Sequence, residues 1–137
     1  MNTKSEEDYL KCLYHLQQGK KNVSTNEIAN YLSMKPSSVS DMLKKLAEKK
    51  CVNYLKYKGS SLTKKGKLIA LSVIRKHRLW ETFLVSKLGF SWSKVHNIAE
   101  QLEHVNSEEL IDKLDHFLAY PQIDPHGDPI PQKNGTI

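Results

Sequence analysis

The chain has 137 residues, of which 39% are hydrophobic and 26% are charged, a composition that is typical of a soluble globular protein and not of a disordered one. This length suits one domain or two small domains that share a core. The net charge of +6 conceals an asymmetry, because residues 1–80 hold 17 Lys and Arg against 6 Asp and Glu, whereas residues 81–137 hold 4 against 9. The basic part indicates a polyanionic partner, and the acidic part indicates cation ligands or a protein interface.

Three helices are predicted within the first fifty residues. Ser5 predicts the N-cap of a helix that continues to about Gln18, and Ser24 opens a second, short helix. Pro36 suits the first turn of a third helix, which runs to about Lys49 and is polar and basic on its outer face. Two short helices joined by a tight turn are typical of a helix-turn-helix, which places its second helix in the major groove of DNA.

A small hairpin is predicted directly after the third helix. Residues 52–57 are rich in β-forming side chains, residues 58–60 predict a turn, and residues 61–63 return. A hairpin in this place is typical of the wing of a winged helix. Thr63 then predicts the N-cap of a long helix that is closed by Gly89.

Two further helices complete the predicted fold. The stretch Trp92–Val105 is predicted to form one helix, for which Ser91 or Ser93 is the starting residue. The other helix begins at Ser107. The composition becomes rich in proline and glycine from Tyr120 onward. The fold is therefore expected to be mainly α-helical, with a winged helix-turn-helix over residues 1–72, a helical dimerisation and metal-binding domain over residues 73–120, and a Pro-rich tail or linker over residues 121–137.

The location of the protein is predicted from its cysteines and its hydropathy. Cys12 and Cys51 lie in segments that resemble core and form no CxxC pair, which favours free thiols in a reducing cytoplasm. Acidic residues occur within the first ten positions, and no apolar run is long enough to cross a bilayer. We therefore expect a cytoplasmic protein with no membrane partner.

Glutamates and histidines at helical spacing form two candidate metal clusters. His77 and Glu81 are four residues apart on the long helix, so they project from one face, and His96 joins them if the next helix lies alongside. The second cluster contains Glu100, Glu103 and His104. Such residues are also common as solvated surface groups, so both interpretations stay open.

Several other polar residues have two interpretations. Asp8 is explained either by capping the first helix or by binding a metal, whereas His15, His116 and His126 have no nearby ligand partners and are expected to be structural or exposed. The lysines of the third helix and the hairpin either solubilise the surface or contact phosphates, and their placement favours phosphate contacts. These lysines are Lys44, Lys45, Lys49, Lys50, Lys56 and Lys58.

Catalysis finds little support. The sequence contains no nucleophile elbow, no glycine-rich phosphate loop and no HExxH, and the serines of the third helix have no neighbouring base. We therefore expect no enzyme activity and no small organic substrate.

Several motifs occur together in a specific order along residues 3 to about 131. They are Glu7-Asp8-Tyr9-Leu10, Lys35-Pro36-Ser37-Ser38-Val39-Ser40, Leu62-Thr63-Lys64-Lys65-Gly66, Arg75-Lys76-His77-Arg78-Leu79, Lys94-Val95-His96 with Glu103-His104-Val105, and Asp124-Pro125-His126-Gly127-Asp128-Pro129-Ile130-Pro131. With these motifs the chain resembles the family of metal-dependent transcriptional repressors that includes the diphtheria toxin repressor and the manganese transport regulator.

This resemblance implies two effector sites per chain. The primary site would use Asp8, Glu100, Glu103 and His104, and the second site would use His77, Glu81 and His96. Asp8 is typical of the manganese-sensing branch, and Glu100 replaces a cysteine of the iron-sensing branch. Ligation by oxygen and imidazole favours Mn²⁺, followed by Fe²⁺. Lys11 occupies the position of a glutamate that bridges paired ions in the manganese branch, so we expect two separated sites.

The resemblance also implies a mechanism and partners. We expect a homodimer that binds operator DNA of metal-uptake genes when metal is bound, because an ion held by Asp8 and by ligands of the dimerisation region would narrow the range of separations between the recognition helices. The iron branch continues into an SH3-like domain, so such a domain is either missing from this sequence or absent from a short member of the family. The expected DNA contacts are Lys35, Ser37, Ser38, Ser40, Asp41, Lys44, Lys56 and Lys58.

Two other functions remain open. One is a small metal-dependent hydrolase that uses the same His/Glu cluster with an open coordination position. The other is a metal-independent winged-helix regulator in which the carboxylates serve only the dimer interface.

Overall fold

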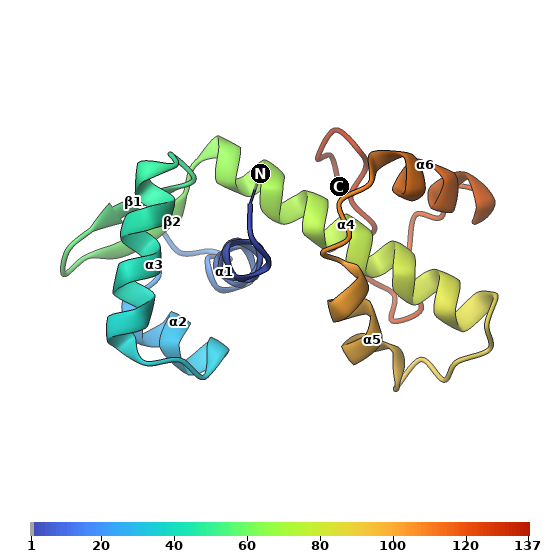
Figure 1. The fold of residues 1–137 in the computed structure, drawn as a ribbon, viewed down its shortest axis with the longest axis horizontal. Helices are drawn as coiled ribbons and strands as arrows, with labels where there is room; N and C mark the ends of the chain where they lie inside the picture. Colours follow the sequence, from blue (N-terminus) through green and yellow to red (C-terminus); the bar gives the residue numbers. More distant parts are fainter. Residues whose placement is uncertain (1) are drawn as a thin grey trace. The chain divides into compact units, whose positions relative to one another are not determined.

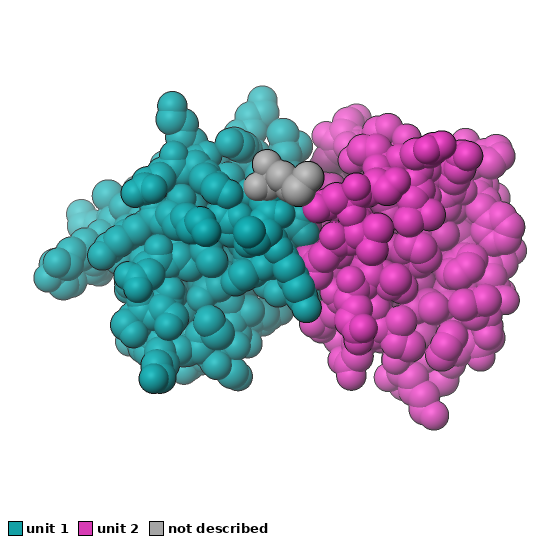
Figure 2. All heavy atoms as spheres, in the orientation of Figure 1, with its two compact units in different colours: residues 1–71 teal, residues 72–137 magenta. Residues whose placement is uncertain are grey.

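The computed structural model describes residues 2–137, which form six α-helices and one two-stranded sheet (Figure 1). The chain divides into two compact units, one up to Leu71 and the other Ser72–Ile137 (Figure 2). The helical architecture with one small sheet confirms the predicted fold class. Within residues 2–137, every helix is too short or too polar to span a membrane.

The first helix, α1, spans Lys4–Leu16, and its N-cap differs from the predicted one. Thr3, not Ser5, is the N-cap. Its hydroxyl accepts a hydrogen bond from the backbone N–H of Glu6, and the Glu6 carboxylate accepts one from the backbone N–H of Thr3. Thr3 and Glu6 have the same spacing as Ser5 and Asp8. Glu6, however, is a glutamate at the third helical position after Thr3, and it completes a reciprocal capping box.

The helices α2, Thr25–Leu32, and α3, Pro36–Glu48, form the helix-turn-helix. Ser24 and Glu27 form the predicted capping box at the start of α2. The turn between the two helices begins at Ser33, which has a left-handed conformation with φ of 54°. Pro36 lies in the first turn of α3, as predicted, because that position needs no backbone N–H.

The hairpin consists of β1, Val52–Leu55, and β2, Gly59–Leu62, which pair antiparallel. Its turn is centred on residues 56–58 instead of the predicted 58–60. Gly59 fixes this register, because it has φ of +94° and a Cβ at this position would lie 2.4 Å from the carbonyl oxygen of Val23. Glycine accepts both the positive φ and the close approach of the Val23 carbonyl without strain. Gly59 is therefore the first residue of β2 and does not lie at the tip of the hairpin.

The core of the first unit is built from α1, α2, α3, the hairpin and the start of the following helix, which contributes Ala70. Burying each large aliphatic side chain contributes about 1.5–3 kcal/mol, so these residues hold α3 with its outer face in solvent. The fully buried members include Leu10, Leu13, Ile28, Val39, Leu43 and Leu46.

The second unit contains most of α4, Lys64–Ser86, together with α5, Val95–Leu102, and α6, Glu108–Phe117. The predicted caps at Thr63 and Ser107 are confirmed, since the Thr63 hydroxyl accepts from Gly66 N–H at 3.1 Å and the Ser107 hydroxyl accepts from Leu110 N–H at 3.2 Å. A small core joins α4, α6 and the C-terminal segment through Leu79, Ile111, Leu114 and Ile130.

The helix α5 is shorter than the predicted helix over Trp92–Val105. Neither candidate serine caps it, because the hydroxyls of Ser91 and Ser93 hydrogen-bond to each other at 2.9 Å, and Lys94 is the N-cap without a side-chain bond. The helix ends with Glu103 as its C-cap. The predicted ligands Glu103 and His104 therefore lie at and beyond the helix end, not along its face.

Candidate metal centre and nucleic-acid interface

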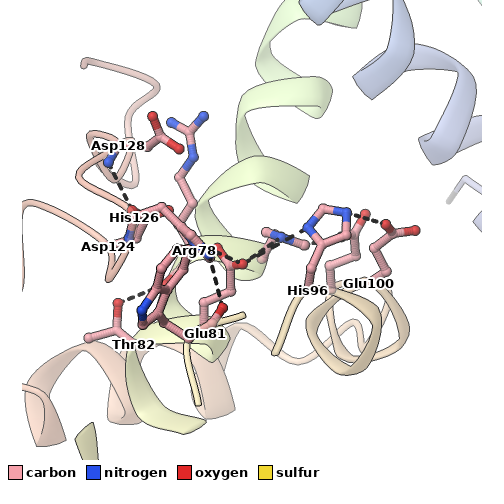
Figure 3. Close-up of polar contacts among 11 residues, drawn as sticks. Arg78, Glu81, Thr82, His96, Glu100, Asp124, His126 and Asp128 are labelled. Carbon is pink, nitrogen blue, oxygen red and sulfur yellow. Dashed lines mark hydrogen bonds and ion pairs between the residues drawn. The ribbon is translucent and has the colours of Figure 1, made fainter. Parts of the chain in front are cut away.

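A buried glutamate on α4 is the centre of the first cluster (Figure 3). Glu81 is only 2% exposed, and three imidazoles approach its Oε2. His77 Nε2 lies at 3.4 Å, His126 Nδ1 at 3.5 Å and His96 Nδ1 at 4.0 Å. His77 comes from the preceding turn of α4, His96 from α5, and His126 from the C-terminal segment. The structure thus brings together all three residues predicted for the second site.

The C-terminal segment adds two residues that we did not predict for this site. Ligand atoms of Glu81, Asp124 and His126 lie within 4.8 Å of one another. The Asp124 carboxylate also accepts hydrogen bonds from the backbone N–H groups of His126 and Asp128, at 2.9 and 2.8 Å. The expectation that His126 has no ligand partner is therefore wrong. The partner is 45 positions away in sequence and becomes visible only once the segment folds back on α4.

The two carboxyl groups at this centre differ in their preferred charge. Burial raises the pKa of Asp124, and the nearby charge of Glu81 raises it further, against the hydrogen bonds from the Asp128 and His126 backbone. Burial also raises the pKa of Glu81, but the hydrogen bond from His77 and the charges of His77 and His126 outweigh this effect and lower the pKa overall. The negative charge is therefore concentrated on Glu81, which faces the imidazoles.

The second cluster lies at the end of α5. Glu103 is 1% exposed, and its Oε1 lies 2.6 Å from His77 Nδ1, while its Oε2 lies 3.6 Å from His104 Nε2. His77 therefore faces Glu81 with one ring nitrogen and Glu103 with the other. Glu100 does not join Glu103 and His104 in this structure, because its carboxylate is half-exposed and lies 2.5 Å from His96 Nε2.

Asp8 and Lys11 belong to the first unit, where both are half-buried on α1. The joint use of Asp8 with Glu100, Glu103 and His104 stays a prediction, as does the expectation drawn from Lys11 of two separated ions.

The donor atoms of the Glu81 centre fit a divalent cation. One ligand atom from each of His77, Glu81 and His96 lies within 4.8 Å of the others. The same holds for the group of Glu81, Asp124 and His126. Carboxylate oxygens and neutral imidazoles together suit Mn²⁺, Fe²⁺ and Zn²⁺. A buried carboxylate is costly unless positive charge or hydrogen bonds compensate it, and a cation would compensate Glu81 directly.

The outer face of α3 and the hairpin turn carry the predicted DNA contacts. Ser37, Ser38, Asp41 and Lys44 are exposed on α3, Lys35 is exposed at its N-cap, and Ser40 is half-buried. On the hairpin turn, Lys56 and Lys58 are exposed.

Lys49 makes an ion pair within the first unit. Its Nζ donates to the buried carboxylate of Glu6, at 2.9 Å from Oε1 and 2.7 Å from Oε2. This ion pair connects the end of α3 to the start of α1. The Lys49 ammonium group is therefore paired with Glu6 in this structure, and its phosphate contact stays a prediction.

Two family models cover nearly the whole chain. Residues 1–60 match "Iron dependent repressor, N-terminal DNA binding domain", and residues 63–132 match "Iron dependent repressor, metal binding and dimerisation domain". The chain belongs to the iron-dependent repressor family. This membership confirms the family resemblance that the sequence motifs predicted.

Solved structures of this family are also similar. A manganese-dependent transcriptional repressor in complex with manganese has 42% identity and a TM-score of 0.87, over 96% of this chain and 60% of that one. ScaR with bound Zn²⁺ has 40% identity and a TM-score of 0.84, over 96% and 62%. IdeR of T. acidophilum has 30% identity and a TM-score of 0.81, over 100% and 64%. The chain thus spans about 60% of the length of the manganese-dependent repressor.

These relatives bear on the question of enzyme activity. The matched domains and the similar structures are those of transcriptional repressors. The hydrolase alternative therefore finds no support within this family.

Proposed function

We propose that this iron-dependent repressor homologue is a metal-activated transcriptional repressor that binds operator DNA as a homodimer when Mn²⁺ or Fe²⁺ is bound. The observation that carries the proposal is the buried Glu81 carboxylate, which faces His77, His96 and His126 within 4.0 Å. A family member whose metal-binding and dimerisation domain holds such a centre is suited to sense a cation. The hairpin and the exposed face of α3 supply the DNA-binding surface.

Two metal sites per chain are proposed. One is the Glu81 centre, with His77, His96, Asp124 and His126 as further donors. The other combines Asp8 with Glu100, Glu103 and His104, a set that rests on the family resemblance. We favour Mn²⁺ at the second set because it contains three carboxylates and no thiolate, and because a similar protein is a manganese-dependent repressor.

The chain's own residues explain how metal occupancy would alter DNA affinity. Asp8 belongs to the DNA-binding unit, whereas Glu103 and His104 belong to the metal-binding unit. Shared ligation by both units would favour a subset of the separations available to the two recognition helices of a dimer. Metal and DNA would then bind cooperatively, because each favours the same subset.

The proposed DNA contacts separate into two groups. Base edges would be met by the polar residues of α3, with Asp41 accepting from a cytosine amino group, whereas Lys56 and Lys58 of the hairpin would bind phosphates. The α3 group consists of Lys35, Ser37, Ser38, Ser40, Asp41 and Lys44. We place this activity in the cytoplasm, at operators of metal-uptake genes.

The test measures DNA affinity as a function of metal. The Mn²⁺-loaded protein first selects a duplex from a random library. This duplex is then titrated with the protein in two buffers, one containing Mn²⁺ and the other containing EDTA. We expect binding with Mn²⁺ and its loss with EDTA. Equal binding in both conditions, unchanged by Glu103→Ala, would identify a metal-independent regulator. Metal-dependent hydrolysis without DNA affinity would contradict the proposal altogether.

A further inference from the structure

The tip of the hairpin carries an aromatic side chain in an unusual backbone conformation. Tyr57 has φ of +72° and is 94% exposed. The turn that holds it is closed by a hydrogen bond from the Lys58 N–H to the Leu55 carbonyl, at 3.0 Å. A bulky residue with positive φ is a genuine outlier, whereas glycine or asparagine adopts this conformation more readily.

Packing within the first unit does not explain Tyr57. Its ring is almost fully in solvent, and the cation that lies over it, Lys56 Nζ at 5.3 Å from the ring centroid, is itself on the exposed turn. An exposed aromatic ring in a strained conformation contributes little to folding. Strained residues that the fold does not require are concentrated at binding sites.

The base of the hairpin holds this tip in a defined direction. Val23 and Ser60 exchange two backbone hydrogen bonds, from Val23 N–H at 2.8 Å and from Ser60 N–H at 2.9 Å. Gly59 lets the two backbones approach this closely, since any Cβ there would meet the Val23 carbonyl. The turn thus presents Tyr57 between two exposed lysines, Lys56 and Lys58, on an anchored support.

We propose that Tyr57 is a DNA-contacting residue. Its ring packs against a deoxyribose of the operator backbone, and its hydroxyl donates a hydrogen bond to a phosphate, between phosphate contacts of Lys56 and Lys58. This chemistry fits the surroundings, because tyrosine is among the side chains that bind DNA phosphates and the flanking charges are both positive. The inference rests on the proposed DNA-binding function and adds an uncharged contact to it.

The experiment compares Tyr57→Asn, Tyr57→Phe and Lys58→Ala with the wild-type chain, using Mn²⁺ and the selected duplex at several salt concentrations. Loss of a hydrogen bond to a charged group weakens binding by about tenfold, so we expect this change for Tyr57→Phe, which loses only the hydroxyl, and a larger one for Tyr57→Asn, which also loses the ring. The slope of log affinity against log salt should stay unchanged in both, because tyrosine releases no counterion. In Lys58→Ala the slope should become shallower by roughly 0.9.

A stability readout separates a binding role from a structural role. Asparagine tolerates positive φ better than tyrosine, so the thermal midpoint of Tyr57→Asn should equal or exceed that of the wild type. Tyr120→Asn is the matched control, since Tyr120 is also exposed, has φ of 55° and lies in the second unit. Its DNA affinity should stay at the wild-type value.

Two results would overturn the inference while leaving the proposed function intact. One is a DNA affinity of Tyr57→Asn equal to that of the wild type. The other is a thermal midpoint of Tyr57→Asn so far below that of the wild type that loss of folded protein accounts for the lost affinity. Failure of the wild-type chain itself to bind the duplex would instead contradict the proposed function.

Discussion

At the level of single residues, Glu81 is the buried centre of the proposed metal site in the second unit. An isolated buried carboxylate is strongly disfavoured, and this one persists because imidazoles and the Asp124 carboxyl group surround it. The same surroundings suit Glu81 to the proposed role of a metal ligand, since this buried carboxylate keeps its charge beside the imidazoles. Burial and charge therefore indicate a binding role more strongly than the sequence spacing of His77 and Glu81 did.

Glu81→Gln tests this role directly. Glutamine keeps the size of the side chain but removes the charge, and loss even of an outer-shell partner lowers metal affinity by about 10–100-fold, so we expect at least this loss at the Glu81 centre. Isothermal titration with Mn²⁺ should count one ion fewer per chain. Glu109→Gln is the control, because Glu109 is exposed on α6 and its ion partner is Lys113 at 3.5 Å. An unchanged ion count in Glu81→Gln would contradict the assignment.

The sequence indicated which candidate site residues lie together where those residues share a helix or neighbouring helices. His77 and Glu81 are one turn apart, so their common face followed from helical geometry. Asp124 and His126 were missed because their approach to Glu81 depends on how a segment rich in proline returns to α4. The available signal was the spacing of Asp124 and His126, two donors separated by a proline within a tail that we expected to be a linker.

At the level of elements, the caps and turns show how far local sequence determines structure. Ser24, Pro36, Thr63 and Ser107 were predicted correctly because each offers one well-defined local hydrogen bond or dihedral angle. The hairpin turn was misplaced by two residues because a long-range contact, between Gly59 and Val23, decides its register. Turn propensity alone does not contain that contact.

Gly59→Ala tests the importance of this contact. Alanine would add the strain of φ +94° and a 2.4 Å clash with the Val23 carbonyl, so we expect a loss of unfolding free energy above about 1–2 kcal/mol. Gly19→Ala is the matched control, because Gly19 has φ of +73° but nothing within 4 Å of an added Cβ. Its loss should reflect the dihedral strain alone. Equal losses by urea denaturation would show that the clash is relieved and the contact unimportant.

The capping box of α2 predicts a dependence of stability on pH. The hydrogen bond from Lys20 and that from the Ser24 backbone lower the pKa of Glu27 below its usual 4.5. A lowered pKa contributes stability that is present above pH 4.5 and is lost as the pH falls through the folded-state value. Glu27→Gln should therefore be less stable than the wild type at pH 6, by at most about 1 kcal/mol because the pair is exposed, and equally stable in acid.

Lys20→Met provides the control for this pH dependence. The Lys20 Nζ lies 2.5 Å from Glu27 Oε2 and is the largest cause of the lowered pKa. In the Lys20→Met background, Glu27→Gln should thus have a smaller acid-dependent effect. An effect of the same size in both backgrounds would assign the pH dependence to another group.

At the level of the whole molecule, the two units carry different groups of candidate functional residues, as the charge asymmetry indicated. The unit up to Leu71 carries the exposed basic and polar face of α3 and the hairpin, and the unit Ser72–Ile137 carries the Glu81 centre and Glu103. Neither set of residues alone explains regulation. In the proposed function, coupling requires that metal binding and DNA binding favour the same arrangement of a homodimer.

This coupling must be reciprocal. If saturation with Mn²⁺ raises affinity for the selected duplex by some factor, typically about 5–150-fold, then the duplex must raise the overall Mn²⁺ binding constant, which is the product over all metal sites, by the same factor. We expect to measure the two factors as equal by anisotropy titrations with DNA and calorimetric titrations with Mn²⁺. Asp8→Asn should bring both factors close to one, because Asp8 is the proposed ligand from the DNA-binding unit, while Mn²⁺ still binds at the Glu81 centre. Asp112→Asn, which alters an exposed partner of Lys133, should leave both factors unchanged. Coupling that survives Asp8→Asn and disappears with Glu81→Gln would transfer the regulatory role to the Glu81 centre.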